Sequence, residues 1–160
     1  MTPPCPSGPD PKRQGPRPIV CYEREVQITD RPFAPFVLGA IAAGGAIGAT
    51  GRWAVAELLD TAGTPHVAGT WPWATLVVNV IGCVLIGLAA RTLSAGTVAW
   101  AFAVTGVLGG FTTFSAFANE SVNLMRQAEA AMTIVNVLAN VLLCLAAVWA
   151  GRSIAFALWR

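Results

Sequence analysis

Polar side chains recur at helical spacing inside apolar stretches of this sequence. Thr75 and Asn79 are four residues apart in the segment WPWATLVVN, so they share one face of a helix. Asn136, Asn140 and Cys144 repeat that spacing and form a polar stripe on an otherwise apolar helix. Such side chains either dock one apolar helix on another or line a path for an ion, and the spacing fits both roles.

Two aromatic rings lie among hydroxyl groups in the segment GGFTTFSAFANE. Phe114 and Phe117 are three residues apart and share a helix face, beside the hydroxyls of Thr113 and Ser115. Paired rings usually serve packing. Because the edge of a ring is electropositive, two edges beside hydroxyls could also solvate a small anion without trapping it as a fixed cation would.

Arg52 follows the glycine-rich segment GGAIGATG toward the far end of the first apolar stretch. A guanidinium there can extend to the membrane surface at modest cost. It can also form an electropositive vestibule that concentrates anions. Glu120 either pairs with Arg52 or caps the third helix.

The remaining composition argues against an enzyme and against a nucleic-acid-binding protein. The single histidine, His66, lies in a Pro/Gly-rich connection, and no metalloprotease, nucleophile-elbow or phosphate-loop motif is present. The net charge of +2 is scattered and forms no basic patch. The four cysteines form no CxxC pair, so we interpret them as unpaired packing residues.

Four uncharged stretches are long enough to position these side chains inside a membrane. They span residues 32–51, 61–90, 92–119 and 130–151, and about 20 apolar residues cross a bilayer. We expect helices at Phe36 to Leu58, Trp73 to Thr92, Thr97 to Arg126 and Ala128 to Phe156. The sequence therefore predicts an all-α membrane protein whose residues 32–160 form a transmembrane domain of four helices.

The third of these helices is predicted to be broken. Gly106, Gly109 and Gly110 lead directly into Thr112 and Thr113, and glycine weakens a continuous helix. Inside a bilayer, non-helical backbone is tolerated only where protein or a polar cavity satisfies its N–H and C=O groups. A break here indicates either tight helix packing or an ion site.

The first 31 residues differ sharply from the rest. They hold half of the 18 charged side chains and most of the 11 prolines, which is typical of a disordered tail. Five of the ten Lys and Arg residues lie in this tail. By the positive-inside rule, we expect the tail and both termini in the cytoplasm, with the helices in the plasma (inner) membrane.

Three segments together, GGAIGATGRW, WPWATLVVNVIG and TGVLGGFTTFSAFANE, resemble the CrcB/Fluc family of fluoride channels over about residues 36 to 151. The resemblance implies passive export of fluoride, which relieves fluoride toxicity. It also implies an antiparallel, dual-topology dimer of two oppositely inserted subunits. Two pores would run along the subunit interface, with a structural sodium ion at its centre.

The resemblance assigns roles to individual positions. Asn79, Phe114 and Phe117 match residues that line the pores, and Arg52 matches a vestibule arginine. The backbone carbonyls of Gly109 and Thr112 match the sodium site. The polar positions expected along the pore are Thr75, Thr113, Ser115, Asn136 and Asn140.

The sequence departs from this family in two respects. Asn136, Asn140 and Cys144 stand where the family often has an aromatic residue and then serines, although amides preserve hydrogen-bond donors. The charged tail is asymmetric, whereas dual insertion needs balanced flanks. One orientation and an oppositely oriented paralogue as partner are therefore an alternative to a homodimer.

Two other functions compete with a fluoride channel. A small multidrug exporter also has four helices but needs a proton-coupled carboxylate within its first span. No acid occurs between Pro32 and Gly51, and Glu57 lies at the end of that span. A structural membrane subunit, whose polar faces only dock helices, is the other alternative.

Overall fold

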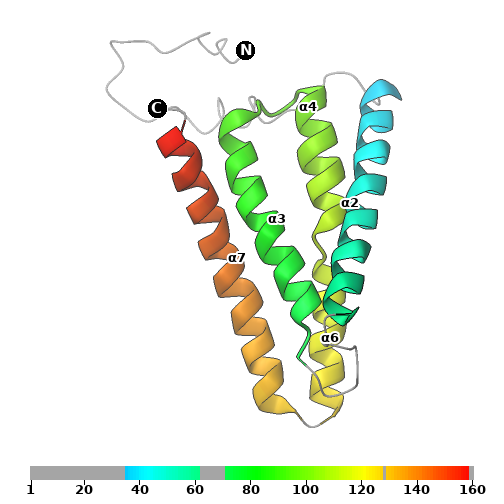
Figure 1. The fold of residues 1–160 in the computed structure, drawn as a ribbon, viewed down its shortest axis with the longest axis vertical. Helices are drawn as coiled ribbons and strands as arrows, with labels where there is room; N and C mark the ends of the chain where they lie inside the picture. The colour runs from blue at the N-terminus through cyan, green and yellow to red at the C-terminus, as the bar shows by residue number, and fades with distance from the viewer. Residues whose placement is uncertain (1–34, 62–70, 128, 159–160) are drawn as a thin grey trace, which may run out of the picture. The chain divides into compact units, whose positions relative to one another are not determined.

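The computed structural model describes residues 35–61, 71–127 and 129–158, without the side chains of residues 60 and 61. Every regular element within these ranges is helical, as the sequence predicts. The predicted tail, residues 1–31, and His66 lie outside the described residues. The helices are α2 (Pro35–Thr61), α3 (Trp73–Thr92), α4 (Val98–Trp100), the π-helix η1 (Ala101–Leu108), α5 (Gly109–Phe111), α6 (Phe114–Arg126) and α7 (Ala130–Leu158) (Figure 1).

The four long helical stretches agree with the predicted spans to within three residues at each end. Three of them are both long and apolar enough to cross a membrane: Trp73–Thr92, Val98–Arg126 and Ala130–Leu158. Helix α2 has 27 residues, which makes it about 40 Å long, but it is rich in Ala and Gly and carries Arg52, Glu57 and Asp60 in its second half. The chain is therefore a helical, multi-pass membrane protein.

Glycines let α2 pack directly against the third helical stretch. A Cβ atom on Gly106 of η1 would lie 2.9 Å from the Cα of Gly44 in α2, a separation that real Cβ atoms essentially never show. The two backbones therefore touch. Helices in lipid associate by close packing through small residues, because the hydrophobic effect does not drive one apolar helix onto another there.

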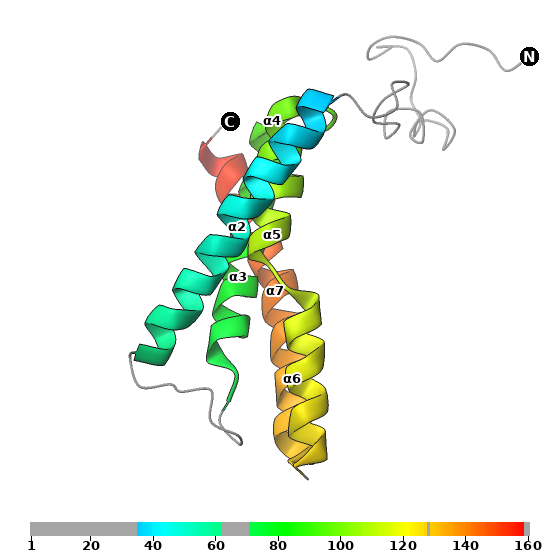
Figure 2. The ribbon, with the colours of Figure 1, turned by 90° about the vertical axis from the view of Figure 1, so that its right-hand side faces the viewer.

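The third helical stretch changes its packing partner at two residues in extended conformation. Thr112 has ψ 155° and Thr113 has ψ 108°, and α6 begins immediately after them. Before these residues, η1 and α5 pack mainly on α2; after them, α6 packs mainly on α7. Figure 2 shows α6 running alongside α7 below this point. The two threonines thus redirect the chain from one neighbour to the other.

Candidate functional site

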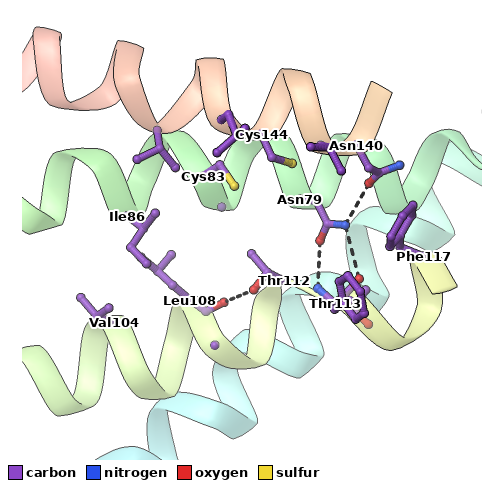
Figure 3. A pocket seen from close by; sticks show the side chains of 16 residues that line it. Asn79, Cys83, Ile86, Val104, Leu108, Thr112, Thr113, Phe117, Asn140 and Cys144 are labelled. Carbon is purple, nitrogen blue, oxygen red and sulfur yellow. Dashed lines mark hydrogen bonds between the residues drawn. The ribbon is translucent and has the colours of Figure 1, made fainter. Parts of the chain in front are cut away.

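The side chain of Asn79 in α3 replaces the helical hydrogen bonds that Thr113 lacks. The Thr113 N–H donates to Asn79 Oδ1 at 2.9 Å, and Asn79 Nδ2 donates to the Thr113 carbonyl at 3.3 Å (Figure 3). A backbone N–H can only donate, so this pairing determines which way the amide points. The Thr113 hydroxyl in turn accepts from the Ala116 N–H at 3.1 Å and caps α6.

A continuous chain of amide hydrogen bonds runs from Asn79 into the contact between α6 and α7. Asn79 Nδ2 donates to Asn140 Oδ1 at 3.2 Å, and Asn140 Nδ2 donates to Asn136 Oδ1 at 3.1 Å. Asn136 Nδ2 donates to Ser121 Oγ at 3.0 Å, and Ser121 donates to the Phe117 carbonyl at 2.8 Å. Asn136 and Asn140 are buried, so this network satisfies groups that would be costly unpaired.

Phe114 and Phe117 meet edge to face at the start of α6. Their ring centroids are 5.4 Å apart and their planes lie at 62°. Phe117 is buried at 8% exposure, whereas Phe114 is 79% exposed. Ser115, also exposed, has its hydroxyl 3.3 Å from that of Thr113. The chain thus presents one ring at its surface and buries the other.

Thr75 lies one turn from Asn79 on α3 but has a different partner. Its hydroxyl donates to Glu120 Oε1 of α6 at 2.5 Å. Thr75 is buried. From the sequence, Glu120 was expected to pair with Arg52 or to cap the third helix; its contact with α3 was not predictable, because it depends on where α6 turns.

A cavity of about 460 Å³ brings most of the predicted polar and aromatic positions together. Its lining is apolar apart from a few polar groups, and none of the described residues that line it is charged. The candidate residues that line it are Asn79, Thr113, Phe114, Phe117, Asn140, Gly109 and Thr112. The candidates that do not line it are Thr75, Ser115, Asn136 and Arg52.

The backbone beside this cavity departs from the helical hydrogen-bond ladder at Thr112 and Thr113. In a continuous helix, the Thr113 N–H would bond the carbonyl of Gly109, but here it donates to Asn79. The Thr112 carbonyl lies between two helices and belongs to neither. Within the described residues, no group of three His, Cys, Asp or Glu side chains could hold a metal ion. A cation near this point would therefore depend on carbonyl and hydroxyl oxygens.

Arg52 lies apart from the cavity, half-buried on α2. The preceding residue, Gly51, faces the Phe111 ring of α5, since a Cβ there would lie 3.7 Å from Phe111 Cδ2. The guanidinium is therefore carried by the helix that packs against the end of α5.

Two residues of the site were missed from the sequence. Ser121 links Asn136 to Phe117, and its spacing of four from Phe117 is the one signal that placed it on the same face. Gly82 lies where a Cβ would overlap the Thr112 methyl group, so a larger residue there would force the Thr112 side chain to move. Its spacing of three from Asn79 is the corresponding signal.

Comparison with known proteins places these residues in a wider group. A family model described as "CrcB-like protein, Camphor Resistance (CrcB)" matches residues 39–152. A protein of Opitutus terrae is 44% identical over 119 residues, covering 70% of this chain and 86% of the relative. One from Elusimicrobium minutum is 42% identical over 116 residues, covering 72% and 88%. One from Agrobacterium fabrum is 40% identical over 118 residues, covering 71% and 91%. All three relatives carry the name "Fluoride-specific ion channel FluC".

Proposed function

This chain belongs to the CrcB family, and from that premise we propose how it works as the subunit of a fluoride channel. Its relatives are fluoride-specific channels, so the chain is a fluoride channel of the plasma membrane and no enzyme. The proposal concerns the path of the ion, the sodium ion and the second subunit. The observation that carries it is the Asn79 amide, held between Thr113 and Asn140 beside the Phe117 ring.

Fluoride is proposed to pass along the cavity by exchanging hydrogen bonds with amide groups. Both donors of Asn79 Nδ2 are engaged by neutral oxygens at 3.2 and 3.3 Å. A fluoride ion is a charged acceptor, and charge-assisted hydrogen bonds are shorter and about twice as strong as neutral ones. The ion can therefore displace these oxygens. The edges of Phe114 and Phe117 would complete its shell, with Thr75, Ser115 and Asn136 as further polar positions along the track.

The uncharged lining supports conduction rather than trapping. A pore must bind its ion strongly enough to replace water and weakly enough to release it. None of the side chains that line the cavity carries a charge. Arg52, which lies outside it, is proposed to draw anions toward the mouth of the pore through its long-range field.

A sodium ion is proposed to bind the carbonyl groups of Gly109 and Thr112. Carbonyls released where a membrane helix is broken are typical ligands of Na⁺. The Gly109 carbonyl fits this role because the Thr113 N–H donates to Asn79 instead, and the functional break of the third helix is part of the proposal. Such an ion would supply positive charge next to extended backbone.

A second subunit in the opposite orientation is proposed to complete each pore. Phe114 is 79% exposed and lines the cavity, so its ring is available to a neighbouring chain. The partner is either a copy of this chain or a paralogue inserted the other way. Tags at both termini would decide between them, because equal populations in the two orientations rule out a fixed orientation.

Purified protein in liposomes tests the proposed pore. We expect passive efflux of fluoride, exclusion of chloride and no dependence on a proton gradient. Asn79→Asp removes the donors and should slow efflux on the order of 10- to 100-fold, as expected for hydrogen bonds to an ion. Phe114→Ile should also slow it. Arg52→Gln should slow efflux more at low than at high ionic strength.

Asn123→Asp is the matched control, because Asn123 is an exposed residue of α6 outside the cavity. It should leave the efflux rate unchanged. Efflux driven by a proton gradient would favour the multidrug-type exporter. Unchanged efflux in both Asn79→Asp and Phe114→Ile would contradict the proposed pore.

A further inference from the structure

Helices α3 and α7 run in parallel and keep a constant register over three successive turns. Asn79 hydrogen-bonds Asn140, at a sequence offset of 61. Two turns later, a Cβ on Gly87 would lie 2.5 Å from the carbonyl oxygen of Val148, again at an offset of 61. Side chains four residues apart share a helix face. The same offset at the turn between them pairs Cys83 with Cys144.

The two thiols of this middle turn lie next to each other. Cys83 and Cys144 are both free cysteines of intermediate exposure, and the common register of α3 and α7 places them opposite each other on facing sides of the two helices. Figure 3 shows their sulfur atoms on the facing sides of α3 and α7, next to the pair of amides. Both residues line the cavity of about 460 Å³. The two thiols are thus adjacent, form no disulfide, and are accessible to an ion in the cavity.

We propose that Cys83 and Cys144 form a two-thiolate site for a soft, linearly coordinated divalent cation, of which Hg²⁺ is the test case. Thiolate sulfur selects soft metals. A structural Zn²⁺ site needs four protein ligands, and within the described part of the chain no third His, Cys, Asp or Glu joins the pair. Two opposed sulfurs suit an ion that takes two ligands.

The charge balance of binding also favours a divalent ion. Each thiol forms one S–Hg bond and releases one proton to solvent, and no electron is transferred. The product, two thiolates around one divalent cation, is neutral. A neutral complex avoids the cost of leaving a net charge among apolar side chains.

This site would block the channel, an inference that rests on the proposed fluoride path. Cys83 is one turn beyond Asn79, and Cys144 is one turn beyond Asn140. One helical turn is about 5.4 Å, so a bound cation would stand directly beside the amides that we propose to contact fluoride. It would hold α3 and α7 together and narrow the cavity.

The test uses full-length chain with Cys5→Ser and Cys21→Ser, which removes the other two cysteines. Native mass spectrometry and thiol labelling after denaturation measure binding. We expect one Hg²⁺ per chain and protection of both thiols. In liposomes, Hg²⁺ should stop fluoride efflux, and a competing dithiol should restore it.

Cys83→Ser and Cys144→Ser are the matched variants, because serine removes the thiol with little change in side-chain size. Joining two ligands in one site makes the second attachment intramolecular, so each variant should need about 100-fold more Hg²⁺ for half-block. If one variant remains as sensitive as its parent, a single reactive thiol is responsible and the pair is refuted. Block that persists in the double variant refutes it too.

The two measurements separate this inference from the proposed pore. If the parent protein conducts fluoride but binds no Hg²⁺ at the pair, the thiol site is wrong and the pore stands. If the parent binds one Hg²⁺ through both thiols but never conducts fluoride, the site stands and the pore is wrong. Binding with unchanged efflux overturns the claim that the site lies on the ion path.

Discussion

Asn79 has two physical roles at the residue scale. It supplies the acceptor and the donor that Thr113 would otherwise find within a helix, and it offers the same Nδ2 donor to Asn140. A buried, extended segment in a membrane is stable only if such partners exist. The amide that we propose to contact fluoride is therefore held in place by the backbone that it supports.

Thr113 gives a residue-scale prediction about this segment. Its hydroxyl caps α6 by accepting from the Ala116 N–H, so Thr113→Ala should lower the free energy of unfolding by about 1 kcal/mol. Thr113→Ser keeps the hydroxyl and should retain most of the stability. Unfolding monitored by circular dichroism in detergent measures both. An alanine variant as stable as the serine variant would show that the cap contributes nothing.

At the element scale, close backbone packing holds the third helical stretch on α2 until the two threonines turn it toward α7. The glycines in the sequence indicated either tight packing or an ion site. The contact of Gly44 with Gly106 shows tight packing on one side of the stretch. The carbonyls of Gly109 and Thr112 leave the ion site as a proposal. The two readings are compatible because they concern different turns.

Gly44 gives the prediction at this scale. A Cβ on Gly44 would lie 3.0 Å from the Cα of Gly106 and closer still to the Phe102 carbonyl oxygen, and neither backbone atom can move aside. Gly44→Ala should therefore destabilise the protein by about 1–3 kcal/mol. Gly39 on the same helix has nothing within 4 Å of its Cβ position, so Gly39→Ala is the control. It should be neutral or stabilising by up to about 1 kcal/mol, since alanine favours helix.

Melting temperatures measured in the same detergent test this prediction, and Gly44→Ala should melt at a lower temperature than Gly39→Ala. Equal melting temperatures would mean that α2 and η1 separate easily and that their glycines have another purpose.

At the scale of the whole molecule, the described chain leaves a cavity bordered by an exposed aromatic ring. Phe114 contributes to this cavity while 79% of its surface is accessible, and large apolar side chains are exposed along α7. Lipid can cover apolar side chains, but a polar path has to be enclosed by protein. This is why a second subunit is part of the proposed function.

Withdrawal of sodium gives the prediction at this scale. If carbonyls of Gly109 and Thr112 hold Na⁺ between two subunits, replacing Na⁺ with a large organic cation should lower the fraction of dimer and the melting temperature. Size-exclusion chromatography with light scattering measures the first quantity. Potassium at the same ionic strength is the control for screening. If the fraction of dimer and the melting temperature are the same in all three cations, the proposed sodium site is wrong.

The sequence alone determined that this protein consists of membrane-spanning helices. The length of an uncharged stretch decides whether it can cross a bilayer, and this does not depend on which helices become neighbours. For the same reason, the spans of α2, α3 and α7 were predictable to within a few residues. Positions that share a face within one helix, such as Asn79 and Cys83, were predictable too, because helical periodicity is local.

Only the tertiary structure decided which polar side chains meet between helices. Asn79 pairs with Thr113 and Asn140, Thr75 pairs with Glu120, and the register of α3 and α7 brings the free cysteines Cys83 and Cys144 to the same turn. The partners in these pairs are between 34 and 61 residues apart along the chain. Their register depends on how closely Gly82 and Gly87 let α3 approach its neighbours, and on where two extended residues turn the chain. Helical periodicity predicts neither the approach of α3 to its neighbours nor the position of the turn, because both arise from contact between separate elements.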